Sequence, residues 1–252
     1  MTVLFCFLVA IVGVVFGGFL GRAAYAVPRG EYREIVAPRC PSCGRALPAR
    51  CSVPVIGFFL TRARCPRCGE RRGIGVFCAE ILFGVCCGLL YWVYGLTYLF
   101  FVYAVLSGAL LMLSLIDVDI HEAPHGLLLV ILLLGVMSFV FSFFDFALTG
   151  TNWWEHLVGA FVVSLPLFIL MMVTGGVGGG DVKLMFVLGL LLGYKLTLLG
   201  FLLGIVAAAI AAVALHFLCG KGGKYPVPLI PFLSLGAGIA VLWGEPILSA
   251  LF

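Results

Sequence analysis

Long apolar runs alternate with short polar segments along almost the whole chain. A helix needs about 20 apolar residues, at about 1.5 Å rise per residue, to cross a bilayer, and seven runs have that length. An eighth run, 182–194, is shorter and is compatible with a tilted span, a snorkelling span or a re-entrant segment. The seven longer runs are 3–20, 74–93, 96–116, 126–148, 157–173, 196–219 and 227–251.

The composition agrees with this pattern. Hydrophobic residues make up 63% of the 252 residues and charged residues only 10%, which lies outside the range of soluble globular proteins. Inside a bilayer every backbone N–H and C=O group needs a partner within the protein, so apolar runs of this length cross as helices. We therefore predict an all-α, polytopic membrane helical bundle of about eight transmembrane helices.

Basic residues are concentrated between the first and second apolar runs. Short loops rich in Lys and Arg stay in the cytoplasm, so this segment is expected inside and the N-terminus outside. Alternation then puts the loops near 117–125 and 174–182 in the cytoplasm as well. Eight spans also place Lys221 and Lys224 inside and leave Lys195 on the wrong side. The arginines of the basic segment are Arg22, Arg29, Arg33, Arg39, Arg45, Arg50, Arg62, Arg64, Arg67, Arg71 and Arg72.

Four cysteines of this segment form two pairs. The first pair is Cys40 and Cys43, and the second pair is Cys65 and Cys68. Residues 44–64 lie between the two pairs. Each C-P-x-C-G turn directs two thiolates at one ion, and two such turns complete a tetrahedral site. Disulfides are the alternative, but a cytoplasmic loop keeps its thiols reduced. We predict a structural zinc, because a closed four-thiolate site leaves no position for water.

Carboxylates beside the apolar runs are the candidates for catalysis, since ionisable groups are rare at membrane depth. Asp117 and Asp119 lie at the end of the third run, and Asp181 follows five glycines in GGVGGGDVKL, residues 175–184. Glycines permit close backbone approach, so this loop can lay an extended substrate strand beside Asp181. Both sites lie at cytoplasmic span ends, and we expect them to meet in three dimensions.

Two carboxylates that face each other share one proton, because like charges at short range cannot both ionise. One then deprotonates a water molecule while the other protonates the scissile amide oxygen, as in aspartic proteases. Asp117 is favoured over Asp119, since residues two apart on a helix face different ways; Asp119 is the fallback. Asp145 and Glu155, which flank an outer loop, are expected in solvent.

The string His121-Glu122-Ala123-Pro124-His125 offers a different chemistry, because it matches the H-E-x-x-H pattern of zinc metalloproteases. On this alternative the chain is an intramembrane metalloprotease with His121 and His125 as ligands and Glu122 as the base, and Asp181 is a distant third ligand. The pattern requires both histidines on one helical face. Pro124 removes an amide donor and disfavours a helix at Ala123.

A second alternative is a non-enzymatic membrane adaptor or transporter with a zinc-stapled cytoplasmic domain. A transporter needs a polar pathway near the bilayer midplane. The apolar runs carry almost no charged residues there, which argues against transport.

Taken together, the motifs resemble those of type IV prepilin peptidases, polytopic aspartic proteases of the G-x-G-D class. The resemblance covers nearly the whole chain and implies that Asp117 and Asp181 are the catalytic pair, at the family's usual spacing. Gly178, Gly180 and Lys183 would support the substrate loop. The matching features are the apolar first span, the two cysteine pairs, Glu80 entering the second span, Ile116-Asp117, Gly178-Gly179-Gly180-Asp181-x-Lys183-Leu184 and PFLSLGA at 231–237.

The resemblance also implies a substrate. Family members are endopeptidases that remove a basic leader from prepilins or pseudopilins on the cytoplasmic side, after a glycine and before the apolar pilin helix. The chain is therefore expected in the bacterial inner membrane, with these substrates and the lipid bilayer as partners and no nucleic acid.

Some family members then methylate the new N-terminus with S-adenosylmethionine. Methylating members tend to carry an acidic residue near the proline between the knuckles, where this chain has Cys51-Ser52-Val53-Pro54. His125 also stands where the family commonly has a second acid. The resemblance thus predicts the peptidase and leaves methylation open.

The expected organisation has three parts. A first transmembrane helix covers 1–21, and the cytoplasmic four-cysteine zinc domain covers 22–73. The membrane peptidase domain, with seven helices, covers 74–252.

Overall fold

The structure is a computed structural model, and it describes residues 2–40, 43–48, 51, 53–70, 73–144, 151–176, 178–219 and 228–251. The chain divides into two compact units, Met1–Ile116 and Asp117–Phe252, and each is described by itself. The described residues fold into helices, with one isolated bridge between Arg39 and Ala46. This confirms the all-helical class that the apolar runs predicted.

Three long helices form the first unit, and short helical turns lie in the connection between the first two. The break between α1 and α5 coincides with the basic, cysteine-rich segment. The elements are α1 (Thr2–Ala26), η1 (Val27–Arg29), α2 (Arg33–Val36), α4 (Ile56–Leu60), α5 (Gly75–Tyr94) and α6 (Tyr98–Ile120), whose last turn belongs to the second unit.

Glycines on one face of α1 let it approach α5 closely. Gly13, Gly17 and Gly21 recur at every fourth residue and face α5, where Ala79 and Gly84 are also small. Such small-residue spacing is typical of tightly packed membrane helices, whose association depends on van der Waals packing because the surrounding lipid is equally apolar. The sequence of α1 thus specifies its partner helix as well as its own helicity.

Gly17→Ala should therefore destabilise the first unit. A Cβ atom at Gly17 would lie 2.6 Å from the carbonyl oxygen of Ala79 and 3.0 Å from the Cα atom of Glu80, so the two backbones would have to separate. We expect the free energy of unfolding in detergent to fall by about 1–3 kcal/mol. The matched control is Gly75→Ala, because nothing lies within 4 Å of a Cβ atom there. Equal unfolding curves for both variants would contradict this account of the packing.

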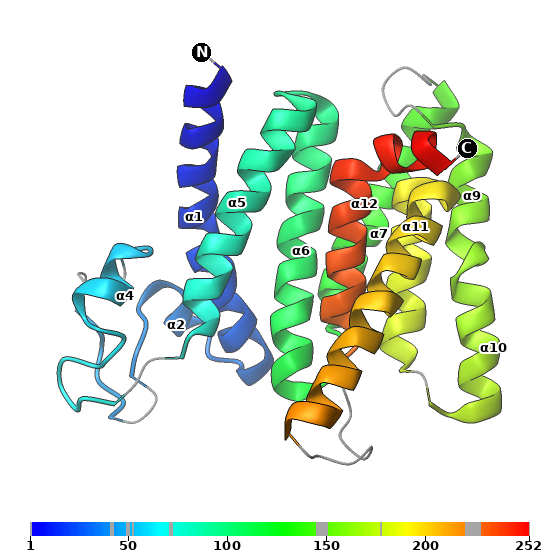
Figure 1. Cartoon of the computed structure of the whole chain (residues 1–252). Helices are drawn as coiled ribbons and strands as arrows, with labels where there is room; N and C mark the ends of the chain where they lie inside the picture. Colours follow the sequence, from blue (N-terminus) through cyan, green and yellow to red (C-terminus); the bar gives the residue numbers. More distant parts are fainter. Residues whose placement is uncertain are drawn as a thin grey trace. The chain divides into compact units, whose positions relative to one another are not determined.

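The second unit contains the remaining helices (Figure 1). A kink separates α9 from α10, and Pro166 explains it, because proline cannot donate to the carbonyl four residues earlier and its ring clashes with that carbonyl. The helices are α7 (His125–Phe144), α9 (Trp153–Val162), α10 (Ser164–Thr174), α11 (Gly179–Cys219) and α12 (Ile230–Leu251).

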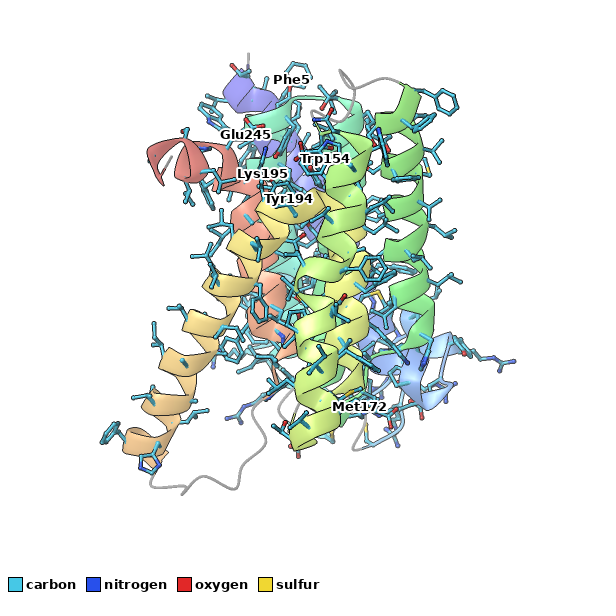
Figure 2. All side chains as sticks on the ribbon, turned by 90° about the vertical axis from the view of Figure 1, so that its right-hand side faces the viewer. Phe5, Trp154, Met172, Tyr194, Lys195 and Glu245 are labelled. Carbon is cyan, nitrogen blue, oxygen red and sulfur yellow. The ribbon has the colours of Figure 1, made fainter. Side chains whose placement is uncertain are left out.

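The helix α11 is interrupted at Gly193, whose φ of 74° and ψ of 170° are not helical. Figures 1 and 2 show that the chain reverses there, so that the second half of α11 runs back at an angle to the first. The first half, residues 179–192, is about 21 Å long at about 1.5 Å per residue, short of the roughly 30 Å hydrocarbon core. The short apolar run of the sequence is this half-helix.

Polar side chains stabilise the reversal. The Nδ1–H of His156 donates to the carbonyl oxygen of Leu190, three residues before the break at Gly193, at 2.8 Å. The other ring nitrogen accepts from Thr151 at 2.8 Å. Both nitrogens of this buried histidine are thus bonded, as burial requires.

An ion pair between Glu155 and Lys195 lies at the same turn. It corrects the expectation for Glu155 and gives Lys195 a partner. Glu155, expected in solvent, is only 6% exposed, and its Oε2 lies 3.6 Å from the Nζ of Lys195. Lys195 is the residue that the charge rule leaves on the wrong side, and its partner is Glu155. Figure 2 shows Lys195, Tyr194 and Trp154 grouped at this end of the unit. Asp145 lies outside the described residues.

Among the described residues, seven helices are long and apolar enough to cross a membrane, with α9 and α10 together as one and the whole of α11 as another. Because α11 reverses direction, the described residues form three long helical segments in the first unit and five in the second, and one of these five, the first half of α11, is shorter than the hydrocarbon core. This agrees with the expectation of about eight. Lys221 and Lys224, which supported that number, lie outside the described residues. The three-part division of the chain stays a prediction.

Candidate active site

Asp117 is a buried carboxylate near the end of α6. Its side chain is 7% exposed, and its Oδ2 accepts a hydrogen bond of 3.3 Å from the backbone N–H of Ile230, at the start of α12. The imidazole of His121, one turn later, is close enough to act on it electrostatically. Asp119 is exposed, as the argument about opposite helix faces predicts.

Asp181 lies in the first turn of α11 and is half-buried. The backbone N–H of Gly178 donates to its carboxyl group, and its own N–H donates to the Gly178 carbonyl at 3.1 Å. A helix N-terminus carries partial positive charge and free N–H groups, so it stabilises a carboxylate there. The glycine loop thus supplies the backbone group that holds this side chain.

The structure brings these two carboxylates together. Asp117 and Asp181 belong to the same unit and interact electrostatically, although 64 residues separate them in the sequence. Close packing of the two loops makes this possible, since a Cβ atom at Gly180 would lie 3.0 Å from that of Ala123. At Gly178 a Cβ atom would lie 3.1 Å from Oδ2 of Asp181.

Two groups at this site escaped the sequence analysis. The N–H of Ile230 holds Asp117, and the side chain of Ala123 packs on the glycine loop. Neither residue has a side chain that signals chemistry. Only the three-dimensional arrangement of the helix ends reveals them.

Lys183 and His125 form a polar pair next to Asp181. The Nζ of Lys183 lies 3.2 Å from the Nε2 of His125, and both side chains are exposed. A lysine ammonium only donates, so Nε2 accepts this hydrogen bond. Lys183 was expected to support the substrate loop, and it lies where that loop leads into α11.

The H-E-x-x-H string does not form a zinc-binding helix. The helix α6 ends at Ile120, His121 has a positive φ of 55°, and α7 begins only at His125. The two histidines therefore do not share a helical face, as the pattern requires. The proline in the string explains the break. The metalloprotease alternative is not favoured.

The four cysteines of the basic segment meet at one point in the first unit. Cys40, Cys43, Cys65 and Cys68 place their Sγ atoms within 4.8 Å of one another. Across the described parts of the chain, no other group of three or more His, Cys, Asp or Glu residues has this geometry. The four thiols could hold a metal ion.

Both cysteine pairs use the same backbone turn. The Gly44 N–H donates to the Cys40 carbonyl at 2.8 Å, and the Gly69 N–H donates to the Cys65 carbonyl at 2.9 Å. Backbone hydrogen bonds from Cys68 and Arg67 lower the pKa of the Cys65 thiol to about 6. A thiolate is the form that binds metal, so the turn prepares Cys65 as a ligand.

Comparisons with known proteins agree with these features. Residues 11–94 match the Bacterial Peptidase A24 N-terminal domain, and residues 104–213 match the Type IV leader peptidase family. The first match contains the cysteine cluster, and the second contains Asp117 and Asp181. No solved structure matches the chain.

Relatives that carry the curated name prepilin leader peptidase/N-methyltransferase match most of the chain, and three of them are described here. The one from Bacillus subtilis is 27% identical over 99% of this chain and 96% of its own length. The one from Stutzerimonas stutzeri is 30% identical over 89% of this chain and 78% of its own length. The one from Neisseria gonorrhoeae is 30% identical over 84% of this chain and 85% of its own length. By these matches, the chain belongs to the type IV leader peptidase family.

Proposed function

We propose that this protein is an aspartic endopeptidase that removes the leader peptide from type IV prepilins or pseudopilins at the surface of the bacterial inner membrane. The observation that carries the proposal is the meeting of Asp117 and Asp181 at one end of a membrane unit. The family and the names of the relatives support the choice of substrate.

The proposed reaction needs one carboxylate ionised and the other protonated. The ionised one takes a proton from a water molecule, which attacks the scissile carbonyl carbon, and the protonated one donates to the carbonyl oxygen. Collapse of the tetrahedral intermediate breaks the C–N bond and transfers a proton to the leaving amine. The N–H groups of Ile230 and Gly178 hold the two carboxyl groups in place during these steps.

The geometry of the cysteine cluster supports one structural zinc as part of the proposal. Four cysteine thiolates fit zinc, and a closed set of four thiolates leaves no coordination position for a reacting water. A zinc ion would then crosslink the segment between α1 and α5 through its four ligands, Cys40, Cys43, Cys65 and Cys68. The ion would stabilise this segment and take no part in peptide cleavage.

N-methylation appears in the names of the relatives, and it stays open for this chain. Residues 44–64 between the knuckles contain no acidic residue, so this stretch does not fit the methylating pattern. A carboxylate from α5 reaches the same place, because Glu80 accepts a hydrogen bond of 2.7 Å from the Val55 N–H, next to Pro54. Mass spectrometry of the cleaved product, with and without S-adenosylmethionine, decides the question.

Membrane vesicles of the two orientations test the function and the side of the reaction together. The basic segment and the alternation of spans place Asp117 and Asp181 on the cytoplasmic side. A prepilin added to inside-out vesicles should therefore be cut after the glycine that precedes its apolar helix, and intact right-side-out vesicles should leave it uncut. Cleavage only by the right-side-out vesicles would reverse the topology. An uncut prepilin in both, and in detergent, would refute the peptidase.

A further inference from the structure

The short helix α4, in the basic segment between α1 and α5, exposes an apolar face. Ile56, Phe59 and Leu60 are 58%, 66% and 69% exposed, and their i, i+3, i+4 spacing places them on one side of the helix. Gly57, on a different side, is buried. Lipid covers the exposed apolar residues of a spanning helix, but α4 has only five residues and cannot span. A cluster of this kind outside a spanning helix marks a contact with a membrane or a protein.

Two kinds of contact hold α4 against the start of α5. The ring of Phe58 stacks on that of Phe77 with 4.4 Å between the ring centroids, and the ring of Phe59 meets Phe77 edge-on at 5.6 Å. The backbone N–H of Val55, directly before α4, donates to Oε2 of the buried Glu80 at 2.7 Å. Figure 1 shows α4 beside the first turns of α5. Side chains and backbone together thus fix the place of α4 along α5.

This place corresponds to a definite depth in the membrane. The apolar run of α5 begins at residue 74, so the first turn of α5 lies at the boundary of the hydrocarbon core. Glu80 comes five residues after Gly75, where α5 begins, and five residues of helix rise about 8 Å. Interfacial helices bury their apolar face about 5–10 Å into the boundary between headgroups and acyl chains. The contacts with α5 therefore hold α4 at the depth of an interfacial helix.

The side of α5 that α4 contacts continues into lipid. Ile81 follows Phe77 by one turn on the same side of α5, and it is 38% exposed, as expected of a residue that faces acyl chains. The glycines of α1 pack on other residues of α5, among them Val76 and Ala79. The helix α4 thus lies at the edge of the α1–α5 pair, where the lipid-facing surface of α5 begins.

The charges next to α4 fit the surface of an anionic leaflet. Arg62 and Arg64 follow the helix directly and are exposed, and residues 44–64 contain no acidic residue. A guanidinium group binds phosphate through paired N–H donors. The cytoplasmic leaflet, on whose side this segment is expected, has a negative surface potential that attracts such residues. An apolar face beside arginines is also typical of helices that lie in the membrane interface.

We propose that α4 is an interfacial helix whose exposed face inserts among the acyl chains of the anionic leaflet, while Arg62 and Arg64 bind lipid phosphates. Glu80 is its positioning residue, because the carboxylate holds the N–H of Val55 and with it the start of α4. This contact with lipid is independent of the proposed peptidase activity. The segment that carries the cysteine cluster would then be attached to the membrane at α4 as well as through α1 and α5.

Photo-crosslinking tests the proposal in the full-length protein, reconstituted into vesicles of phosphatidylethanolamine and anionic phosphatidylglycerol. A photoreactive phenylalanine analogue in place of Phe59 or Leu60 should crosslink to phospholipid. The matched control is the same analogue in place of Arg45, which is also exposed but lies in the first cysteine turn, and it should crosslink to lipid severalfold less. Mass spectrometry identifies the crosslinked molecule, and unfolding curves in detergent show that each labelled protein is folded.

Two variants of Glu80 test its positioning role. Glu80→Ala removes the acceptor of the Val55 N–H, whereas Glu80→Gln keeps a carbonyl oxygen there. Crosslinking to lipid from position 59 should fall severalfold with Glu80→Ala and stay near its original level with Glu80→Gln. If Glu80→Ala does not fold, the crosslinks in the protein with Glu80 still decide whether α4 lies in lipid.

Lipid composition tests the role of the arginines. Crosslinking from position 59 should fall when phosphatidylcholine replaces the anionic mixture, because the attraction between guanidinium groups and the leaflet is lost. Replacing both Arg62 and Arg64 with glutamine should remove the difference between the two kinds of vesicle. An unchanged difference would show that these arginines do not bind the headgroups.

Three results would contradict the proposal. Crosslinks from positions 59 and 60 to a second copy of the chain or to another protein, with little lipid, would show that a protein covers the face. Equal labelling of lipid from positions 45, 59 and 60 would show that α4 is not inserted. Equal lipid crosslinking in Glu80→Ala and Glu80→Gln would show that Glu80 does not position the helix. None of these measurements uses peptide cleavage, so a failure of the proposed function would leave them unaffected.

Discussion

Replacing either Asp117 or Asp181 with asparagine is expected to lower the rate of prepilin cleavage by about 10²–10⁴-fold or more, the usual contribution of a general acid or base. Asparagine has nearly the same shape but can neither share the proton nor activate water. The variants should stay folded, since an amide oxygen can still accept the N–H of Ile230 or Gly178. Single-turnover cleavage of a purified prepilin measures the effect, and detergent unfolding measures the fold.

Two neighbouring carboxylates provide the controls for this experiment. Asp119→Asn changes an exposed carboxylate at the end of α6, the helix that carries Asp117. Glu122→Gln removes the base that a metalloprotease would use. Both variants should keep most of the activity. An inactive Glu122→Gln together with an active Asp117→Asn would instead support the zinc mechanism.

Loss of the cysteine cluster should have the second large effect. Replacing Cys40 and Cys65 with serine is expected to reduce bound zinc from one ion per chain to none, because two of four ligands disappear. Structural zinc contributes about 10–16 kcal/mol of binding free energy in zinc-finger peptides, and that energy is coupled to folding. Elemental analysis measures the metal, and limited proteolysis of residues 22–73 measures the fold of the segment.

Cys51→Ser is the matched control for the cluster. Cys51 is 3% exposed, like Cys40 and Cys65, but it does not belong to the four that meet. Its replacement should leave the zinc content unchanged. Equal zinc in the wild type, the double variant and the control would show that the cluster does not hold the ion.

The sequence predicted those features that depend on local composition. Apolar runs give helices because a bilayer offers no partner for free backbone groups, so the passes could be placed without a structure. The cysteine pairs were equally visible, since each C-P-x-C-G turn is a local motif. The proximity of Asp117 and Asp181 could be expected because alternation of the spans places both residues at helix ends on the same side of the membrane.

Features that arise from contacts between distant helices could not be predicted in this way. The ion pair between the buried Glu155 and the exposed Lys195 exists only because α11 reverses next to α9. The rule that basic loops stay in the cytoplasm counts each lysine by its position in the sequence. It takes no account of an ion-pair partner from another helix.

The interruption of α11 has a mechanical consequence. Each half of this helix has its own ladder of hydrogen bonds, and the first half is held by buried leucines, among them Leu184 and Leu188. The second half is largely exposed along one side, up to Phe217 at 79%. Because the helix is interrupted at Gly193, we expect a bend or tilt at that distal end to be taken up at the break and not to reach Asp181 as it would through one rigid helix. The candidate catalytic carboxylate would thereby be insulated from bilayer-driven movement of the longer segment.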